Sequence, residues 1–320
     1  MTAVLFTCAG QRVDIVTAFG RAGAETIAAD FNPLAPTLHA ADGQLLPPPI
    51  EHEEYVPTLA AAVAEHGVAL VVPLGDLDME ILARRRDELG ALLLLPGLEV
   101  VERTNDKYRA HLHFQEQGIG SPASWLPGDL PADPPFPLLV KPRQGFGSRN
   151  IFRAADRSEL DFFVARAPAD SFVQAVCAGE EFSIDVFCDL EGRCLNAIPR
   201  TMIESKGGES IKGMTIADEE LVELGRHVAE TVGVVGPANI QCFRSAPGRS
   251  EITDVNLRFG GAFPLPLAAG SDYPALALAL ARGERPEPRV GSFRENVVMT
   301  RFFSEICLVR GANGELEPLT

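Results

Sequence analysis

Residues 138–151 read LLVKPRQGFGSRNI, and the interpretation of the whole chain starts from them. The apolar run predicts a strand that ends at Lys141, where a proline stops it. Gly145, Gly147 and Ser148 follow in a loop, and glycines let backbone N–H groups approach phosphate oxygens closely. Lys141 adds a positive charge for the same phosphates. The segment predicts a phosphate-binding loop without the Walker A order of residues, and a β-hairpin with a glycine turn is the alternative.

Length and composition are those of a globular protein with two or three domains. The chain has 320 residues, of which 46% are hydrophobic and 22% charged. Its formal net charge of −16 disfavours nucleic acid or an anionic membrane as the main partner. The six cysteines form no Cys-x-x-Cys pair and no zinc spacing, so free thiols in a reducing compartment are expected. With no basic leader and no apolar run of membrane-spanning length, the sequence predicts a cytoplasmic protein.

The first 103 residues alternate between strands and helices. Strands are expected at 3–7, 25–29, 68–72 and 92–95, and helices after residue 12, at 54–66 and at 78–89. Because such alternation is typical of a parallel sheet covered on both faces, the sequence predicts a Rossmann-like α/β domain over residues 1–103.

Acidic residues end two of these strands. Asp30 lies 20 residues after Gly10, the spacing of a ribose-binding acid. The Gly-x-Gly-x-x-Gly pattern is missing, which disfavours NAD, so Asp30 either only ends a strand or contacts another small ligand. Asp76 and Asp78 follow the strand at 68–72 and are suited to an amine or a cation, with a solvated loop as the alternative.

The remaining residues predict a mixture of strands and helices. A helix at 104–117 is expected, with Thr104 or Asn105 as its N-terminal cap. The region 199–216 contains Arg200 and Lys206 and is interpreted as a flexible polar loop. Further strands are expected at 171–176, 182–188, 193–198, 238–244, 251–257 and 297–303, and further helices at 156–166, from 221 to 232 and at 273–282.

Oxygen-bearing side chains gather on two of these strands. Asp254 and Asn256 are two residues apart and therefore face the same side, and Gln241 on the neighbouring strand can share that face. One carboxylate and two amides suit Mg²⁺ bound together with phosphate oxygens. Arg258 continues the same face and is suited to a transferring phosphate. The alternative is a polar strand face that contacts solvent.

Taken in order, these segments make nearly the full chain resemble the ATP-grasp superfamily, especially single-unit proteins similar to one half of the carbamoyl-phosphate synthase large chain. Five motifs support the resemblance: Asn105-Asp-Lys107, 140–148, Gln174-x-Val176-x-x-Gly179-x-Glu181, Gly208-Glu-Ser210 and Asp254-x-Asn256-x-Arg258-Phe-Gly-Gly261. The resemblance implies an α/β fold with an α+β clamp. A Rossmann-like preATP-grasp domain at 1–103 would precede a two-lobed ATP-grasp domain at 104–320. The small lobe would cover about 108–175 and the large lobe about 176–320.

The resemblance also implies a role for each motif residue. Lys107 and Lys141 would hold the phosphates of ATP, and the loop of Gly145, Gly147 and Ser148 would close over them. The adenine and ribose contacts would come from Gln174, Val176 and Glu181. Gln241, Asp254 and Asn256 would bind Mg²⁺ or Mn²⁺, although the family usually has Glu where Asp254 stands. Arg258 would be catalytic at the acyl-phosphate step, with Lys206 as a second basic residue near the phosphates.

By this resemblance, the chain is expected to be an ATP- and Mg-dependent carboxylate–amine ligase that forms a C–N bond through an acyl phosphate and releases ADP and phosphate. No Ser-His-Asp or Cys-His set occurs at the motif positions, in agreement with chemistry that needs no protein nucleophile. The alternatives are phosphorylation of bicarbonate, as in a partial carbamoyl-phosphate synthase reaction, and a nucleotide-binding regulatory module without turnover. Small-molecule substrates would contact Arg12, Asp76 and Arg200, and a homodimer is the expected assembly.

Overall fold

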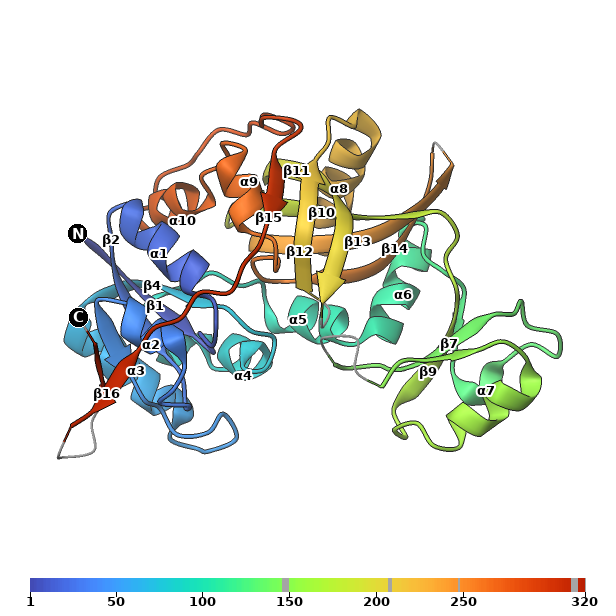
Figure 1. Cartoon of the computed structure of the whole chain (residues 1–320), viewed down its shortest axis with the longest axis horizontal. Helices are drawn as coiled ribbons and strands as arrows, with labels where there is room; N and C mark the ends of the chain where they lie inside the picture. Colours follow the sequence, from blue (N-terminus) through green and yellow to red (C-terminus); the bar gives the residue numbers. More distant parts are fainter. Residues whose placement is uncertain (146–149, 207–208, 247, 312–315, 320) are drawn as a thin grey trace.

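The computed structural model describes residues 1–145, 150–206, 209–246, 248–311 and 316–319. Three bodies follow one another along the longest axis (Figure 1). A parallel-sheet domain lies at one end, a small antiparallel sheet lies at the other, and a large antiparallel sheet lies between them. Among the described residues, no helix is long and apolar enough to cross a membrane.

The first body is a five-stranded parallel sheet in the order β3-β2-β1-β4-β5, which confirms the predicted Rossmann-like arrangement. Alternate residues of β1 pack on opposite faces: Leu5 packs in the cluster that contains helix α3, and Phe6 in the cluster that contains α1 and α10. The strands are β1 (Thr2–Thr7), β2 (Ala24–Ala29), β3 (Gly43–Leu45), β4 (Val68–Pro73) and β5 (Leu92–Leu93). The helices are α1 (Val13–Arg21), α2 (Pro36–Ala40), α3 (Tyr55–His66) and α4 (Met79–Arg84).

Two helices, α5 (Leu98–Asn105) and α6 (Lys107–Glu116), connect this domain to the rest of the chain. Helix α6 confirms most of the helix predicted at 104–117, but the predicted start and the predicted cap, Thr104 or Asn105, are wrong. Asp106 separates the two helices in an extended conformation, and its carboxylate accepts the N–H groups of Tyr108 and Arg109. The α6 cap thus puts Lys107 at the first position of a helix.

The small antiparallel sheet has the strand order β6-β9-β7-β8, and helix α7 packs against it. Its core contains Leu138, Val140, Ala154, Leu160 and Val173. The elements are β6 (Ser124–Trp125), β7 (Leu138–Pro142), β8 (Phe152–Ala154), α7 (Arg157–Val164) and β9 (Ser171–Ala175). The predicted strand that ends near Lys141 is thus β7, which lies between β8 and β9 and pairs with both.

The large sheet has the order β14-β13-β10-β11-β12-β15, and α8 packs against β10 and β11. The predicted flexible loop at 199–216 is wrong, because this region forms most of a hairpin between β11 and β12. The polar residues of this region were expected to contact solvent, whereas Arg200 is buried and pairs with Asp185 on the neighbouring strand. The elements are β10 (Glu180–Cys188), β11 (Cys194–Lys206), β12 (Glu209–Thr215), α8 (Glu219–Val232), β13 (Gly236–Ala246), β14 (Arg249–Asn256) and β15 (Val298–Thr300).

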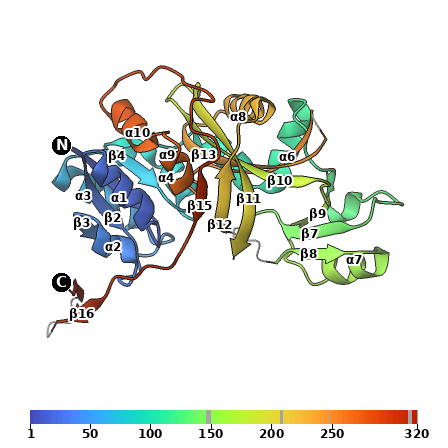
Figure 2. The same ribbon diagram turned by 45° about the horizontal axis from the view of Figure 1, so that its top comes forward.

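The C-terminal part of the chain returns to the first domain. Helices α9 (Pro264–Ala268) and α10 (Tyr273–Ala281) follow the loop after β14, and α10 packs against α1 and β4. After β15 the backbone runs along the first domain to the strands β16 (Leu308–Arg310) and β17 (Leu316–Pro318), as Figures 1 and 2 show. The predicted strand at 297–303 is shorter, and the β16–β17 pair was not expected.

Candidate active site

The oxygen-bearing residues of the large sheet lie next to one another. In the β13–β14 pair, Gln241 stands directly opposite Asp254, and Asn239 stands opposite Asn256. All of these side chains occupy one face because the pleat repeats every two residues. Gln241, Asp254 and Asn256 are partly exposed, whereas Val255 between them is buried on the other face. The register therefore brings together the three predicted metal-binding residues, and their binding role stays a prediction.

Positive charge surrounds Asp254. The ammonium of Lys107 donates to its carboxylate at 2.6 Å, and each of these side chains is 18% exposed. Burial by itself would raise the pKa of Asp254, but the charges of Lys107, Lys141 and Arg258 outweigh burial, so the pKa lies below its usual value. One carboxylate thus stays ionised among three cations.

Lys141 is the most buried of these cations. It lies at the end of β7 with 7% exposure, and its ammonium stands 5.2 Å from the ring centre of Phe172. Burial lowers the pKa of Lys141 to about 8, with Lys107 acting in the same direction and Asp254 against it. A buried ammonium with this pKa gains much from an added anion, because such an anion restores the interactions lost with water.

A cavity of about 330 Å³ lies beside this group, where all three bodies meet. Asp76 and Glu80 come from the first domain, Lys107 from α6, Gly145 from the glycine loop, and Asp254 and Asn256 from β14. Two further predicted residues of the glycine loop, Gly147 and Ser148, lie outside the described residues, as does the side chain of Lys206. The cavity therefore connects the predicted phosphate group to the strand ends of the first domain.

The predicted nucleotide-base residues lie on β9 and β10. Gln174 is 4% exposed, and its Nε2 donates to Ser124 Oγ at 3.0 Å. Val176 follows β9, and its N–H points to the carbonyl of Pro137. Glu181 is half-buried on β10, and burial raises its pKa although the charge of Arg200 opposes the rise. Because one amide N–H is taken by Ser124, an adenine contact through Gln174 would use its carbonyl oxygen or its second N–H.

Arg258 and Asp76 form an ion pair between the large sheet and the first domain. The Nε of Arg258 donates to Asp76 Oδ1 at 2.9 Å. Two residues predicted separately, one as catalytic and one as an amine contact, thus meet at one edge of the cavity. Asp30 has a different place: its carboxylate accepts the N–H groups of Gly10 and Asn32 and closes a loop.

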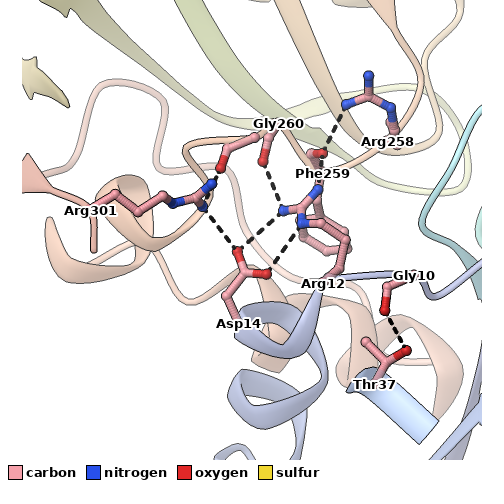
Figure 3. Close-up of polar contacts among 9 residues, drawn as sticks. Gly10, Arg12, Asp14, Thr37, Arg258, Phe259, Gly260 and Arg301 are labelled. Carbon is pink, nitrogen blue, oxygen red and sulfur yellow. Dashed lines mark hydrogen bonds and ion pairs between the residues drawn. The ribbon is translucent and has the colours of Figure 1, made fainter. Parts of the chain in front are cut away.

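The other two predicted substrate contacts are engaged within the protein. Arg12 donates to two backbone carbonyls and to Asp14, as Figure 3 shows. Arg200 is 2% exposed and donates to Asp185 at 2.7 Å. A substrate contact through either guanidinium would require these interactions to open, at the cost of an unpaired buried carboxylate in the case of Asp185.

The sequence interpretation missed several residues that shape the site. Arg143 pairs with Asp106, the cap that sets Lys107 at the helix start. Asp14 and Arg301 join Arg12 around the loop after β14. No local sequence pattern predicts the contacts of Arg143 with Asp106 or of Arg301 with Asp14, because these partners are distant in sequence. Only the position of Asp14 in the first turn of a helix is recognisable from the sequence.

Comparisons with known proteins agree with this architecture. A family model described as "ATP-grasp in the biosynthetic pathway with Ter operon" matches residues 168–302, and the model "PylC-like, N-terminal domain" matches residues 4–93. A comparison with curated proteins finds no matching sequence.

Solved structures share the fold at low sequence identity. The biotin carboxylase domain of Hydrogenobacter thermophilus 2-oxoglutarate carboxylase is 18% identical with a TM-score of 0.74, over 93% of this chain and 73% of that one. An L-amino acid ligase from Bacillus licheniformis is 20% identical with a TM-score of 0.68, over 92% and 78% of the two chains. N5-carboxyaminoimidazole ribonucleotide synthetase from Thermotoga maritima is 16% identical with a TM-score of 0.68, over 90% and 78%.

The two family models fall on the two parts of the chain where the structure has a parallel-sheet domain and a large antiparallel sheet. The solved structures share the fold over about nine-tenths of the chain. Residues 168–302 thus match an ATP-grasp family model, and the fold of the chain is consistent with the ATP-grasp superfamily.

Proposed function

We propose that this protein is an ATP- and Mg²⁺-dependent ligase that joins a small carboxylate to an amine and releases ADP and phosphate. One observation supports this most directly: Lys107, Lys141 and Arg258 surround the single carboxylate of Asp254 beside a cavity. Because Arg258 pairs with Asp76, Lys107 and Lys141 share the carboxylate of Asp254, and this pair of ammonium groups suits a polyphosphate although the chain has a net charge of −16.

The residues present fit a nucleotide–metal complex. Gln241, Asp254 and Asn256 offer oxygen atoms only, the donor type that Mg²⁺ or Mn²⁺ takes together with phosphate oxygens. The Asp254–Lys107 pair fits the same use, because both members gain a partner of opposite charge when metal and phosphate arrive together. The biotin carboxylase domain at 18% identity is described with MgADP, which supports the same ligand here.

The proposed mechanism depends on positioning and charge. Bound ATP would supply the phosphoryl group that activates the substrate carboxylate. Lys107 and Lys141 would hold the phosphates, and Asp254 with the two amides would hold the metal. Arg258 lies at the cavity edge, where its guanidinium can neutralise charge that develops on the transferring group. Bound substrates that fill the cavity would exclude water from it, so that an amine rather than water would attack the activated carboxylate.

The amine is proposed to bind near Asp76, on the first-domain side of the cavity. The carboxylate of Asp76 already binds the guanidinium of Arg258, and the ammonium group of a substrate within reach would bind the same carboxylate. The L-amino acid ligase among the similar structures supports amino acids as the first substrates to examine.

A second candidate function is the phosphorylation of bicarbonate. The biotin carboxylase domain that matches 93% of this chain is described with bicarbonate as well as ADP. The same description names a dimer, which supports a homodimer as the assembly to look for here.

The test is phosphate release by the purified protein with Mg-ATP and amino acids, singly and in pairs, or with bicarbonate. Arg258→Ala should lose the activity, whereas Arg157→Ala, on the surface of α7, should keep it. Release that needs two amino acids would support the ligase, and release with bicarbonate alone would support the second candidate. Mg-ATP binding without release on any substrate of the panel would count against both.

A further inference from the structure

The loop after β14, residues 258–261, is bound by arginine side chains from outside the strand. Arg12 Nη1 donates to the carbonyl of Phe259 at 3.0 Å, and Arg12 Nη2 donates to the carbonyl of Gly260 at 2.9 Å. Arg301 Nη2 donates to the carbonyl of Gly261 at 2.5 Å. Figure 3 shows both guanidinium groups directed at this backbone. Three successive carbonyls thus receive charge-assisted hydrogen bonds, which are stronger than neutral ones.

One carboxylate orients both arginines. Asp14, in the first turn of α1, accepts from Arg12 Nε at 3.2 Å and from Arg12 Nη2 at 3.3 Å. The same carboxylate lies 3.6 Å from Arg301 Nη2. All three side chains are less than one-third exposed. We call Arg12, Asp14 and Arg301 the carbonyl clamp.

The opposite side of the loop rests on a rigid polar group. A Cβ at Gly260 would stand 2.5 Å from Asp185 Oδ1 and 3.1 Å from Asn239 Nδ2, so only glycine fits there. Asp185 is itself fixed, since Arg200 Nε donates to it at 2.7 Å and Asn239 Nδ2 at 2.8 Å. The loop is therefore held between the carbonyl clamp and the face of the large sheet.

This support reaches Arg258 through the backbone. Arg258 Nη1 donates to the Phe259 carbonyl at 3.3 Å, the same oxygen that Arg12 binds. Its Nε is held by Asp76. We propose that Arg12, Asp14 and Arg301 are positioning residues that fix the direction of the Arg258 guanidinium. This inference rests on the proposed function, in which Arg258 acts on the transferring phosphate.

The first test does not depend on activity. Hydrogen exchange is measured on peptides that span residues 258–266, where Phe263 N–H bonds the Gly260 carbonyl and Leu265 N–H bonds the Ala262 carbonyl. Arg12→Gln should exchange at least about tenfold faster here, since it loses the charge-assisted bonds to the loop. Arg12→Lys should lie between Arg12→Gln and wild type, and the surface variant Arg157→Gln should match wild type. Unchanged exchange in Arg12→Gln would overturn the proposal.

The second test separates positioning from folding and from nucleotide binding. In Arg12→Gln and Asp14→Asn, kcat for ATP turnover should fall about 10- to 100-fold while KM for ATP stays within about twofold. Arg12→Lys should recover part of kcat. A rise in KM with kcat unchanged would contradict a positioning role. A wild-type protein that turns over no ATP would refute the proposed function, whereas the exchange result would still decide whether the carbonyl clamp orders the loop.

Discussion

Asp254→Asn is expected to destabilise the protein and to abolish the strengthening of ATP binding by Mg²⁺. The change removes the carboxylate that contacts Lys107 and leaves the repulsion between Lys107, Lys141 and Arg258 without a compensating negative charge. Ion pairs at the surface contribute up to about 1 kcal/mol, and loss of one partner of a buried pair costs about 3–5 kcal/mol. With each side chain 18% exposed, the pair lies between these limits, so the free energy of unfolding at pH 7 should fall by about 2 kcal/mol.

The pH dependence of this difference has a defined sign. The pKa of Asp254 in the folded protein lies below its ordinary value of 3.8. Its stabilising contribution is therefore fully present above that value and is lost as the pH falls through the folded pKa. Urea unfolding at several pH values should show a constant difference between wild type and Asp254→Asn near neutrality, and a smaller one in acid below pH 4.

Binding measurements complete the test of Asp254. With metal removed by EDTA, calorimetry should show that ATP binds about 3- to 10-fold tighter to Asp254→Asn, because the cations have lost their counter-charge. Added Mg²⁺ should no longer strengthen binding. Asp161→Asn, which removes an exposed pair with Arg157, should change stability by less than about 0.5 kcal/mol. Equal stability of Asp254→Asn and wild type, or an intact Mg²⁺ effect, would refute the reasoning.

Three further changes probe other parts of the site. Nucleotide affinity should fall as the pH rises through about 8, where Lys141 loses its charge, and calorimetry on Lys141→Arg should show a constant affinity over the same range. Gly260→Ala should lower the free energy of unfolding in urea by about 1–3 kcal/mol, because its Cβ would stand 2.5 Å from Asp185 Oδ1. Gly128→Ala, with no heavy atom within 4 Å, is the control and should be nearly neutral. In competition binding, Glu181→Ala should bind ATP and 2′-deoxy-ATP alike, and a persisting preference would argue against a ribose contact.

The parts of the fold that could be predicted are those in which residues close together in the sequence form a recognisable pattern. The strands β1 and β4 are buried on both faces, so nearly all of their residues are apolar, and such uninterrupted apolar runs indicate a parallel sheet. The two-residue spacing of Asp254 and Asn256 gave their common face, because neighbouring side chains in a strand alternate. Arg258 and Asp76 were both singled out, although nothing in the sequence pairs them.

The errors arose where distant residues decide local structure. Region 199–216 looked like a loop because its polar residues were taken as solvated, whereas Arg200 is buried against Asp185 on another strand. The helix predicted at 104–117 was started three residues too early, because Asp106, which caps α6, was interpreted as part of the helix. The contacts of Arg12 with the loop after β14 join positions more than 240 residues apart, and no sequence pattern spans that separation.

The carbonyl clamp and the Asp76–Arg258 pair have a consequence for how this protein can be recombined with its relatives. Arg12, Asp14 and Asp76 all come from the first domain, and all reach the loop that carries Arg258, directly or through Arg301. A chimaera that took its first domain from a protein of similar fold would keep the glycine loop and the strands β13 and β14. It would nevertheless misplace Arg258 unless the three residues were transplanted together. We therefore expect the amino-terminal domain and the loop that carries Arg258 to be exchangeable only as a matched pair.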